Sequence, residues 1–418
     1  MRRMLGLIVV AAALAARWSV AENLLHEGDS VAICGDSITE QKQYSVFLDD
    51  FLLMCQPAAG LRAVQFGWSG EQAGGLAGRM ANDVLPFGFS VATTCYGMND
   101  GGYAPMNEEK GKAYRHNQQQ IVQSFKKAGV RVVVVGSPGA VDTETFRHDP
   151  QMAAMYNPTL AALRDIAKSV AADEGVVFAN VYDPMMDVMT KAKARYGKAY
   201  HVAGGDGVHP AANGHLVMAY AFLKALGCDG NIGTITVDLA QGTATADGGH
   251  KILACKNGAI EIESARYPFC FFGQPDSPDS TRGVLPFLPF NDELNRFQLV
   301  VKGTTAAQLK VTWGAESKVF PAADLAKGIN LAAEFLDNPF AGPFREVEQK
   351  VRAKQNEETP ALKQCLHDLP AYARFLPDEQ QTLQRLAGKL VDKAKANAAA
   401  MPAAVAPVKH TITIAPAG

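Results

Sequence analysis

Residues 30–38 have the sequence SVAICGDSI, a short apolar run followed by a Gly-Asp-Ser turn. The apolar run predicts a buried strand. After the turn, apolar side chains recur at spacings of three and four residues between Tyr44 and Cys55, which predicts an amphipathic helix. A strand, a turn and a helix in this order form the repeating unit of α/β proteins.

The same alternation of apolar runs and helical periodicity continues to about residue 227. The run 131–135 is nearly all valine, as expected for a strand that is covered on both faces in a parallel sheet. Further strands are predicted at 61–66, 89–96 and 176–181, and further helices at 110–128, 151–173 and 211–226. We therefore expect residues 22–228 to form a doubly wound, three-layer parallel α/β domain.

After residue 227 the pattern changes to short strands separated by Gly, Pro, Asp and Ser, which predicts a small β-sandwich-like domain over 229–329. Residues 330–400 are rich in helix formers and are interpreted as a packing or partner surface whose charges form a solvated face. Residues 408–415 alternate like a strand. We expect this last strand to return to the β domain, so that the helical segment is an insertion.

The composition indicates a globular protein and excludes several classes. With 418 residues the chain is long enough for two or three domains, and 48% of its residues are hydrophobic, which is sufficient for a core. Lys+Arg 40 against Asp+Glu 42 leaves a net charge of -2. Because nucleic-acid-binding proteins usually carry a basic excess, we expect no nucleic-acid partner.

The N-terminal residues have the pattern of a secretory signal peptide. Arg2 and Arg3 precede an apolar run over 5–16, and the small residues at 19–21 provide a cleavage site. The run is shorter than the roughly 20 residues that span a bilayer. We therefore expect residues 1–21 to be a signal peptide and the protein to be secreted or periplasmic, without a membrane span.

The seven cysteines do not indicate a disulfide scaffold, because their number is odd and the chain is long. Cys34 and Cys95 lie in apolar runs and are predicted to be buried thiols. Cys255 and Cys270 flank a hairpin-like segment and are the best candidates for a disulfide. The nine histidines include no His-x-His and no His-Glu-x-x-His spacing, so the sequence indicates no metal site and no cofactor.

Four short polar stretches follow strands or precede the last helix of the first domain. They are GDSI at 35–38, GWSG at 67–70, GMND at 97–100 and DGVHP at 206–210. Ligands of open α/β sheets bind beyond the carboxyl ends of the strands, so we expect these stretches to meet at one edge. Each alone could be an ordinary turn, and the prediction of a site depends on their conjunction.

These stretches contain the groups that nucleophilic catalysis needs. A serine hydroxyl needs an adjacent base, so Ser37 is the candidate nucleophile and His209 the candidate base. Asp206 is the carboxylate that would orient the imidazole. The candidate oxyanion hole consists of the backbone N–H groups of Ser37 and Gly70 and the side-chain amide of Asn99.

Residues beside these candidates receive other assignments. Asp36 and Asp100 are interpreted as hydrogen-bonding residues that shape the loops. His215 lies farther into the last helix of the domain and is interpreted as structural. Trp68 and Tyr96 could line a substrate pocket or belong to the core.

In order and approximate spacing, the four stretches resemble the sequence blocks of the SGNH (GDSL) hydrolase family over residues 27–227. The resemblance matches Ser37 to the family's nucleophile, Gly70 and Asn99 to its oxyanion-hole residues, and Asp206 with His209 to its Asp-x-x-His pair. It implies a flavodoxin-like sheet of about five parallel strands and ester hydrolysis without a metal. An isoleucine at position 38 replaces the family's usual leucine and changes no chemistry.

The general arrangement of the second half is similar to that of exported bacterial members with an accessory β domain, which often act on acylated glycans. We therefore expect a serine esterase that removes acetyl or other short acyl groups from an extracellular carbohydrate. The enzymatic alternatives are an arylesterase, a lysophospholipase or a thioesterase acting on small or lipidic acyl esters, and a glycan acyltransferase.

A non-enzymatic alternative is a carbohydrate-binding protein whose β domain presents aromatic side chains to sugars. We favour a core position for these aromatic residues. They are Trp313, Tyr267, Phe269, Phe271 and Phe272. A second group could form an interdomain seam or one wall of the substrate cleft. It consists of Arg282, Asn291, Asp292, Asn295 and Arg296.

Overall fold

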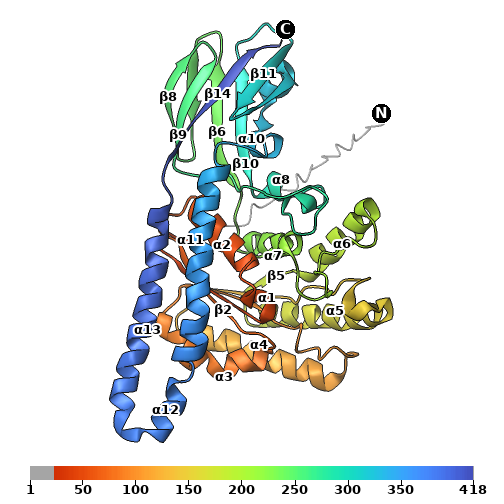
Figure 1. Ribbon diagram of the computed structural model, residues 1–418, viewed down its shortest axis with the longest axis vertical. Helices are drawn as coiled ribbons and strands as arrows, with labels where there is room; N and C mark the ends of the chain where they lie inside the picture. Colours follow the sequence, from red (N-terminus) through yellow and green to blue (C-terminus); the bar gives the residue numbers. More distant parts are fainter. Residues whose placement is uncertain (1–22, 418) are drawn as a thin grey trace, which may run out of the picture.

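Residues 30–35 form strand β1 (Ser30–Gly35) of a five-stranded parallel sheet in the computed structural model, which describes residues 23–417 (Figure 1). The strand order is β2-β1-β3-β4-β5, the flavodoxin-like order. The other strands are β2 (Arg62–Gly67), β3 (Val91–Cys95), β4 (Val132–Gly136) and β5 (Val177–Ala179). The predicted fold class of this half is confirmed. The predicted signal peptide lies outside the described residues.

Helices cover both faces of this sheet because successive side chains of each strand point to opposite sides. The odd-numbered residues of β1 share an apolar cluster with α2 (Tyr44–Met54) and α7 (Ala212–Ala225). Its even-numbered residues share another cluster with α3 (Ala73–Asp83) and α4 (Glu108–Lys127). The remaining long helices of the domain are α5 (Pro150–Asp173) and α6 (Tyr182–Tyr196). No helix within the described part of the chain is both long and apolar enough to cross a membrane.

The second half forms two further sheets, which lie above the first domain in Figure 1. One has the order β13-β10-β6-β7 and the other the order β12-β11-β14-β9-β8. The bounds are β6 (Asn231–Asp238), β7 (Thr243–Ala246), β8 (His250–Lys256), β9 (Ala259–Ser264), β10 (Arg296–Lys302), β11 (Gln308–Trp313), β12 (Glu316–Pro321), β13 (Ile329–Asn330) and β14 (Val408–Pro416). The last strand, β14, pairs antiparallel with both β9 and β11, so its predicted return to the β domain is confirmed. The sequence pattern does not predict β7 and β12, because their side chains are largely exposed on both faces.

A chain of buried hydrogen bonds links the two sheets of the β domain. The indole N–H of Trp313 donates to Nδ1 of His410 (3.1 Å), whose Nε2 lies 2.9 Å from Ser264 Oγ. The Ser264 hydroxyl in turn lies 2.7 Å from Nδ1 of His250, and Nε2 of His250 lies 3.1 Å from the carbonyl oxygen of Ile232. Because Trp313 can only donate, the directions of the remaining bonds follow, and each imidazole is neutral with its proton on Nε2.

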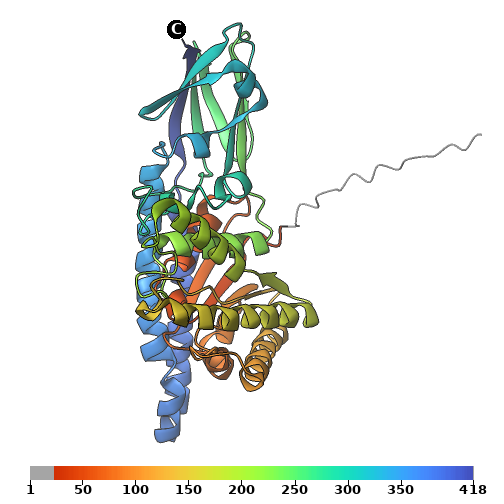
Figure 2. The same ribbon diagram turned by 90° about the vertical axis from the view of Figure 1, so that its right-hand side faces the viewer.

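A helical arm, residues 341–400, joins the two sheets to the side of the first domain. It consists of α11 (Ala341–Pro360), a π-helical turn (Ala361–Leu366), α12 (Leu369–Phe375) and α13 (Gln380–Ala400). The two long helices run along the first domain in both views (Figure 1, Figure 2). They contact α2 and the edge strand β2, whose free side is thereby covered.

The interpretation of the arm's charges as a solvated face is wrong where the arm meets the first domain. Lys354 is buried, and its Nζ lies 2.9 Å from a carboxylate oxygen of Asp49 on α2 and 3.2 Å from one of Glu358. Gln355 is also buried and accepts a hydrogen bond from Ser45 Oγ at 2.7 Å. These polar residues are buried because they face α2 and β2 rather than solvent.

The disulfide suggested for Cys255 and Cys270 does not form, and all seven cysteines, which lie within the described residues, are free thiols. Cys255 pairs with Ile260 near the turn between β8 and β9, whereas Cys270 follows the opposite end of β9. Cys34 and Cys95 are buried, as predicted.

The aromatic residues of the β domain belong mainly to the core, as we favoured. Trp313, Tyr267, Phe269 and Phe271 are buried, and Phe272 is half-buried. They therefore do not form an exposed platform for sugars.

The polar group around residues 282–296 makes its strongest contacts within the second half of the chain. The guanidinium of Arg296 donates to the carbonyl oxygen of Asp229, just after α7, at 2.6 Å. The amide of Asn295 exchanges hydrogen bonds with the backbone of Phe269 at 2.8 and 3.0 Å. The Arg282 guanidinium pairs with Asp337 at 2.5 Å, next to the start of the arm. None of these partners lies within residues 22–228, so the interdomain seam stays a prediction.

The buried histidine pair should make the β domain sensitive to acid. Burial lowers the pKa of His250 and of His410 to about 4, below the value of about 6.5 for an exposed histidine. Between these values the unfolded chain binds more protons than the folded chain, so the free energy of unfolding falls as the pH falls from 6.5 towards 4. We expect a loss on the order of 2 kcal/mol per histidine at pH 5 relative to pH 7. Urea unfolding at the two pH values measures it. A His250→Gln/His410→Gln variant should show a smaller pH dependence, and an unchanged dependence would contradict the assignment.

Removing the buried cation of the arm should destabilise the protein strongly. In Lys354→Met, Asp49 and Glu358 remain buried without their cation, so the free energy of unfolding should fall by about 3–5 kcal/mol. Equilibrium unfolding of the full chain measures this. The matched control is Lys350→Met, exposed on the same helix, which should change stability by less than about 0.5 kcal/mol. Equal stabilities of the two variants would refute the prediction.

Candidate active site

Ser37 lies at the carboxyl end of β1, where the chain turns into the short helix α1 (Ser37–Glu40). Asp36 caps this helix, because its carboxylate accepts the backbone N–H of Ile38 at 3.0 Å. β1 is paired on one side with β2 and on the other with β3, so the loops after these strands flank Ser37. The predicted meeting of polar stretches at one sheet edge is therefore observed.

The structure brings Ser37, His209 and Asp206 into one hydrogen-bonded line. Ser37 Oγ lies 2.8 Å from His209 Nε2, and His209 Nδ1 lies 2.6 Å from Asp206 Oδ2. The other carboxylate oxygen of Asp206 accepts the backbone N–H groups of Val208 and His209, both at 2.9 Å. Asp206 therefore holds both the imidazole ring and the turn that carries it.

The charge of Asp206 is favoured in this position. Partial burial raises the pKa of its carboxyl, but the hydrogen bonds from His209 and Val208 outweigh burial and hold the pKa below its usual value. The carboxylate thus fixes the proton of His209 on Nδ1 and leaves Nε2 free to accept the proton of Ser37.

Gly207 is required by the geometry of this loop. Its φ is +78°, in the left-handed region, and a β-carbon there would lie 2.3 Å from the Cα of Phe146. Any larger residue would push the loop, and His209 with it, away from the sheet edge.

The predicted oxyanion-hole residues lie on the two loops that flank Ser37. Gly70 follows β2 with φ +74°, and no described residue accepts a hydrogen bond from its N–H. Asn99 follows β3 and donates one amide hydrogen to the carbonyl oxygen of Glu71 at 3.0 Å, while its Oδ1 accepts the hydroxyl of Tyr103 at 3.1 Å. These two bonds fix the amide and leave its second N–H available to a ligand.

Asp36 and Asp100 shape the loops, as predicted. Asp100 accepts the backbone N–H groups of Ala73 and Gly97, both at 3.0 Å, and so joins the loop after β3 to the start of α3. Burial raises the pKa of Asp100 to about 6. Burial also raises the pKa of Asp36 to about 7, with a further contribution from the nearby charge of Asp100.

His215 is structural, also as predicted. It is buried, its Nδ1 accepts the backbone N–H of Tyr44 at 3.2 Å, and its Nε2 lies 3.0 Å from Gln41 Oε1. Burial lowers its pKa to about 3, so the ring remains neutral and links α7 to the chain after α1.

Of the two alternatives for Tyr96, the structure gives the core position. Tyr96 is fully buried, and its hydroxyl donates to a carboxylate oxygen of Glu71 at 2.6 Å. Trp68 is half-buried, and three polar side chains lie against its ring. These are Arg79 and Lys363, at 4.9 and 4.7 Å from the ring centre, and His367, whose ring centre is 4.7 Å away.

The sequence alone does not reveal the ion pairs behind the Gly70 loop. Glu71 forms two hydrogen bonds with the buried guanidinium of Arg79, at 2.6 and 2.8 Å, and Arg79 also donates to the carbonyl oxygen of Phe66 at 2.8 Å. Glu71 and Arg79 lie eight positions apart, and the third member, Tyr96, comes from the loop after β3. No local spacing could therefore have indicated this cluster.

Within the described residues, no group of three or more His, Cys, Asp or Glu side chains is arranged to hold a metal ion.

Comparisons with known proteins show what this chain is similar to. Residues 33–217 match the GDSL-like lipase/acylhydrolase family. An acetylxylan esterase of Geobacillus stearothermophilus is 25% identical over 220 residues, which are 49% of this chain and 94% of that protein. The structure of a gut microbial diltiazem-metabolizing enzyme covers 93% of this chain and 98% of its own, with a TM-score of 0.71 at 22% sequence identity. This last likeness shows that the fold is shared nearly from end to end.

Proposed function

We propose that this chain, a carboxylic ester hydrolase whose residues 33–217 match the GDSL-like lipase/acylhydrolase family, works through Ser37, His209 and Asp206. The observation that carries the proposal is the line of two hydrogen bonds, 2.8 and 2.6 Å long, through the imidazole of His209. This is the arrangement that activates a serine hydroxyl.

The proposed reaction begins when His209 Nε2 takes the proton of Ser37 and Ser37 Oγ attacks the acyl carbonyl carbon. Negative charge develops on the carbonyl oxygen, to which the N–H groups of Ser37 and Gly70 and the amide of Asn99 donate. The imidazolium, stabilised by Asp206, then gives its proton to the leaving alcohol. Water, activated by His209, hydrolyses the acyl-enzyme in the same manner and restores the hydroxyl of Ser37.

We propose a short acyl ester of an extracellular carbohydrate as the substrate. The relative named acetylxylan esterase supports this class. The open position of the site also supports it, because the side chains of His209 and Asp206 are 36% and 55% exposed and a polymer could reach them. The signal peptide proposed for residues 1–21 would bring the enzyme to such a substrate outside the cytoplasm.

Replacing the nucleophile or the base should abolish turnover without unfolding the protein. We expect Ser37→Ala and His209→Ala each to lower kcat on 4-nitrophenyl acetate by roughly 10⁴-fold or more. Asp206→Asn keeps an oxygen for the turn but removes the charge, so it should leave more residual activity than Ser37→Ala. Circular dichroism and thermal unfolding serve as controls. Retention of a tenth of the wild-type kcat by Ser37→Ala would rule out the proposed mechanism.

The substrate proposal predicts a preference for short acyl groups on sugars. Across 4-nitrophenyl esters of increasing chain length, kcat/KM should be highest for acetate, and the enzyme should release acetate from acetylated xylan or pectin. Ser37→Ala is the matched blank. A clear preference for long acyl chains, without release from any acetylated glycan, would favour the lipidic or aryl ester alternatives instead.

A further inference from the structure

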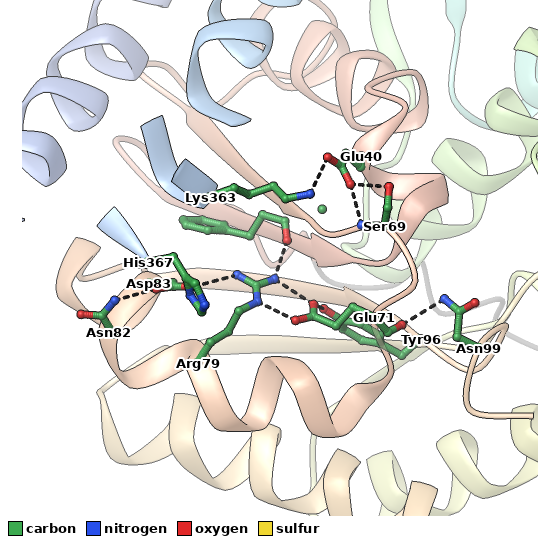
Figure 3. A network of polar contacts seen from close by, with 12 residues as sticks. Glu40, Ser69, Glu71, Arg79, Asn82, Asp83, Tyr96, Asn99, Lys363 and His367 are labelled. Atoms are coloured by element: carbon green, nitrogen blue, oxygen red, sulfur yellow. Dashed lines mark hydrogen bonds and ion pairs between the residues drawn. The ribbon is translucent and has the colours of Figure 1, made fainter. Parts of the chain in front are cut away.

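The helical arm reaches the active-site rim through one lysine. Lys363, on the π-helical turn of the arm, places its Nζ 2.7 Å from Glu40 Oε1 (Figure 3). Glu40 is the last residue of α1, the helix that begins with Ser37. The two partners are only 23% and 19% exposed, so the ion pair is better shielded than a surface pair.

The other oxygen of Glu40 holds the loop that presents Gly70. Glu40 Oε2 accepts both the backbone N–H and the hydroxyl of Ser69, each at 2.5 Å. Ser69 directly precedes Gly70. Two consecutive charge-assisted contacts therefore connect Lys363 to the residue before the proposed oxyanion donor.

The Glu40 carboxylate depends on Lys363 for its cation. Burial raises the pKa of Glu40, but the hydrogen bonds from Lys363 and Ser69 outweigh burial and hold the pKa below its usual value. The neighbouring Lys42 donates to the backbone carbonyl of Glu40 at 3.0 Å rather than to its carboxylate. Without Lys363, Glu40 would be a weaker and less fixed acceptor for Ser69.

The arm also holds Trp68, one residue earlier on the same loop. Lys363 Nζ lies 4.7 Å from the centre of the indole ring, within cation–π distance. His367, four residues later on the arm, packs edge-on against the same ring and hydrogen bonds with Asp83 at 2.8 Å. Both residues that precede Gly70 are thus held from the arm, whereas Glu71 after it is held by the first domain's own Arg79.

Gly70 needs this support because glycine itself restricts its backbone very little. Its N–H can stabilise an oxyanion only if it points at that oxygen to within a few tenths of an ångström. On the basis of the proposed function, we propose that Lys363 is a positioning residue that aims the Gly70 N–H through Glu40 and Ser69, so that the helical arm completes the active site.

The arm can remain docked when Lys363 is changed, because its attachment lies elsewhere. The buried contacts of Lys354 with Asp49 and Glu358 lie nine residues earlier along the arm. The effect of Lys363 on the Gly70 N–H can therefore be tested separately from the docking of the arm, by changing residue 363 alone in the full chain.

The test compares Lys363→Met, Lys363→Arg and the control Lys350→Met, which changes an exposed lysine of the same arm. With 4-nitrophenyl acetate, Lys363→Met should lower kcat about 10- to 100-fold, with KM changed by less than about threefold, because the Gly70 N–H matters most in the transition state. Lys363→Arg should recover kcat to within about fivefold of wild type, and Lys350→Met should be unaffected. The thermal midpoint of Lys363→Met should stay within about 2 °C of wild type.

A double-variant cycle tests the route through Glu40. If Lys363 acts through Glu40, Glu40→Gln/Lys363→Met should be no slower than the slower single variant, whereas independent effects would multiply. A wild-type kcat in Lys363→Met would overturn the proposal, and so would a fall in kcat accompanied by a large fall in thermal midpoint, because that would mean an undocked arm. A failure of the proposed function would give a different result: the esterase activity of the wild type would be retained in Ser37→Ala.

Discussion

The hydrogen bond between Ser37 and His209 joins residues 172 positions apart, and this contact depends on the topology of the first domain. In a parallel sheet, all strands end at the same edge, so the loops after β1, β2 and β3 converge there. The connection between α6 and α7, residues 197–211, brings His209 to the same edge. The contact is also sensitive to small displacements, since a hydroxyl activates only within hydrogen-bonding distance of its base. Gly207, against Phe146, and Asp206, which binds two backbone N–H groups, set the position of the imidazole to that tolerance.

Local signals in the sequence predict the strands of the first sheet and the residues of the proposed triad, but not the contacts that support them. Ser37, Gly70, Asn99 and the 206–209 pair can be predicted because each lies in a short polar stretch at the end of a predicted element. Tyr96 shows the limit, since an aromatic residue at a strand end can equally face a pocket or the core. Its buried bond to Glu71 depends on which strands are neighbours, and that is decided by tertiary packing. For the same reason, the burial of Lys354 on a charged helix could not be inferred from its helix alone.

The helical arm is docked by polar rather than purely apolar contacts, and this has a physical cost. Asp50 lies fully buried beside Asp49, none of the described residues donates a hydrogen bond to it, and burial raises its pKa far above the usual value, with a further contribution from nearby Glu348. A buried ionic cluster of this kind contributes less stability than an apolar interface of equal volume would. The ionic cluster does, however, disfavour every other register of α11 on α2, because a shift by one turn would leave charges buried without partners. The register of α11 in turn determines whether Lys363 lies opposite Glu40.

The β domain takes part in setting that register because of where the arm begins and ends. The arm begins soon after β13, which is an edge strand of the four-stranded sheet. After the arm, the chain continues into β14, the middle strand of the five-stranded sheet. The Trp313–His410–Ser264–His250 chain ties β14 to β11, β9 and β8 and reaches β6 in the opposite sheet. Both ends of the arm are thus attached to the sheets of the second half, while α11 and α13 between them pack on β2. A segment held at both ends loses little further conformational entropy when the helices between those ends dock. The sandwich therefore favours the Lys363–Glu40 contact without touching it, which gives the second half of the chain a mechanical connection to the loop that carries Gly70.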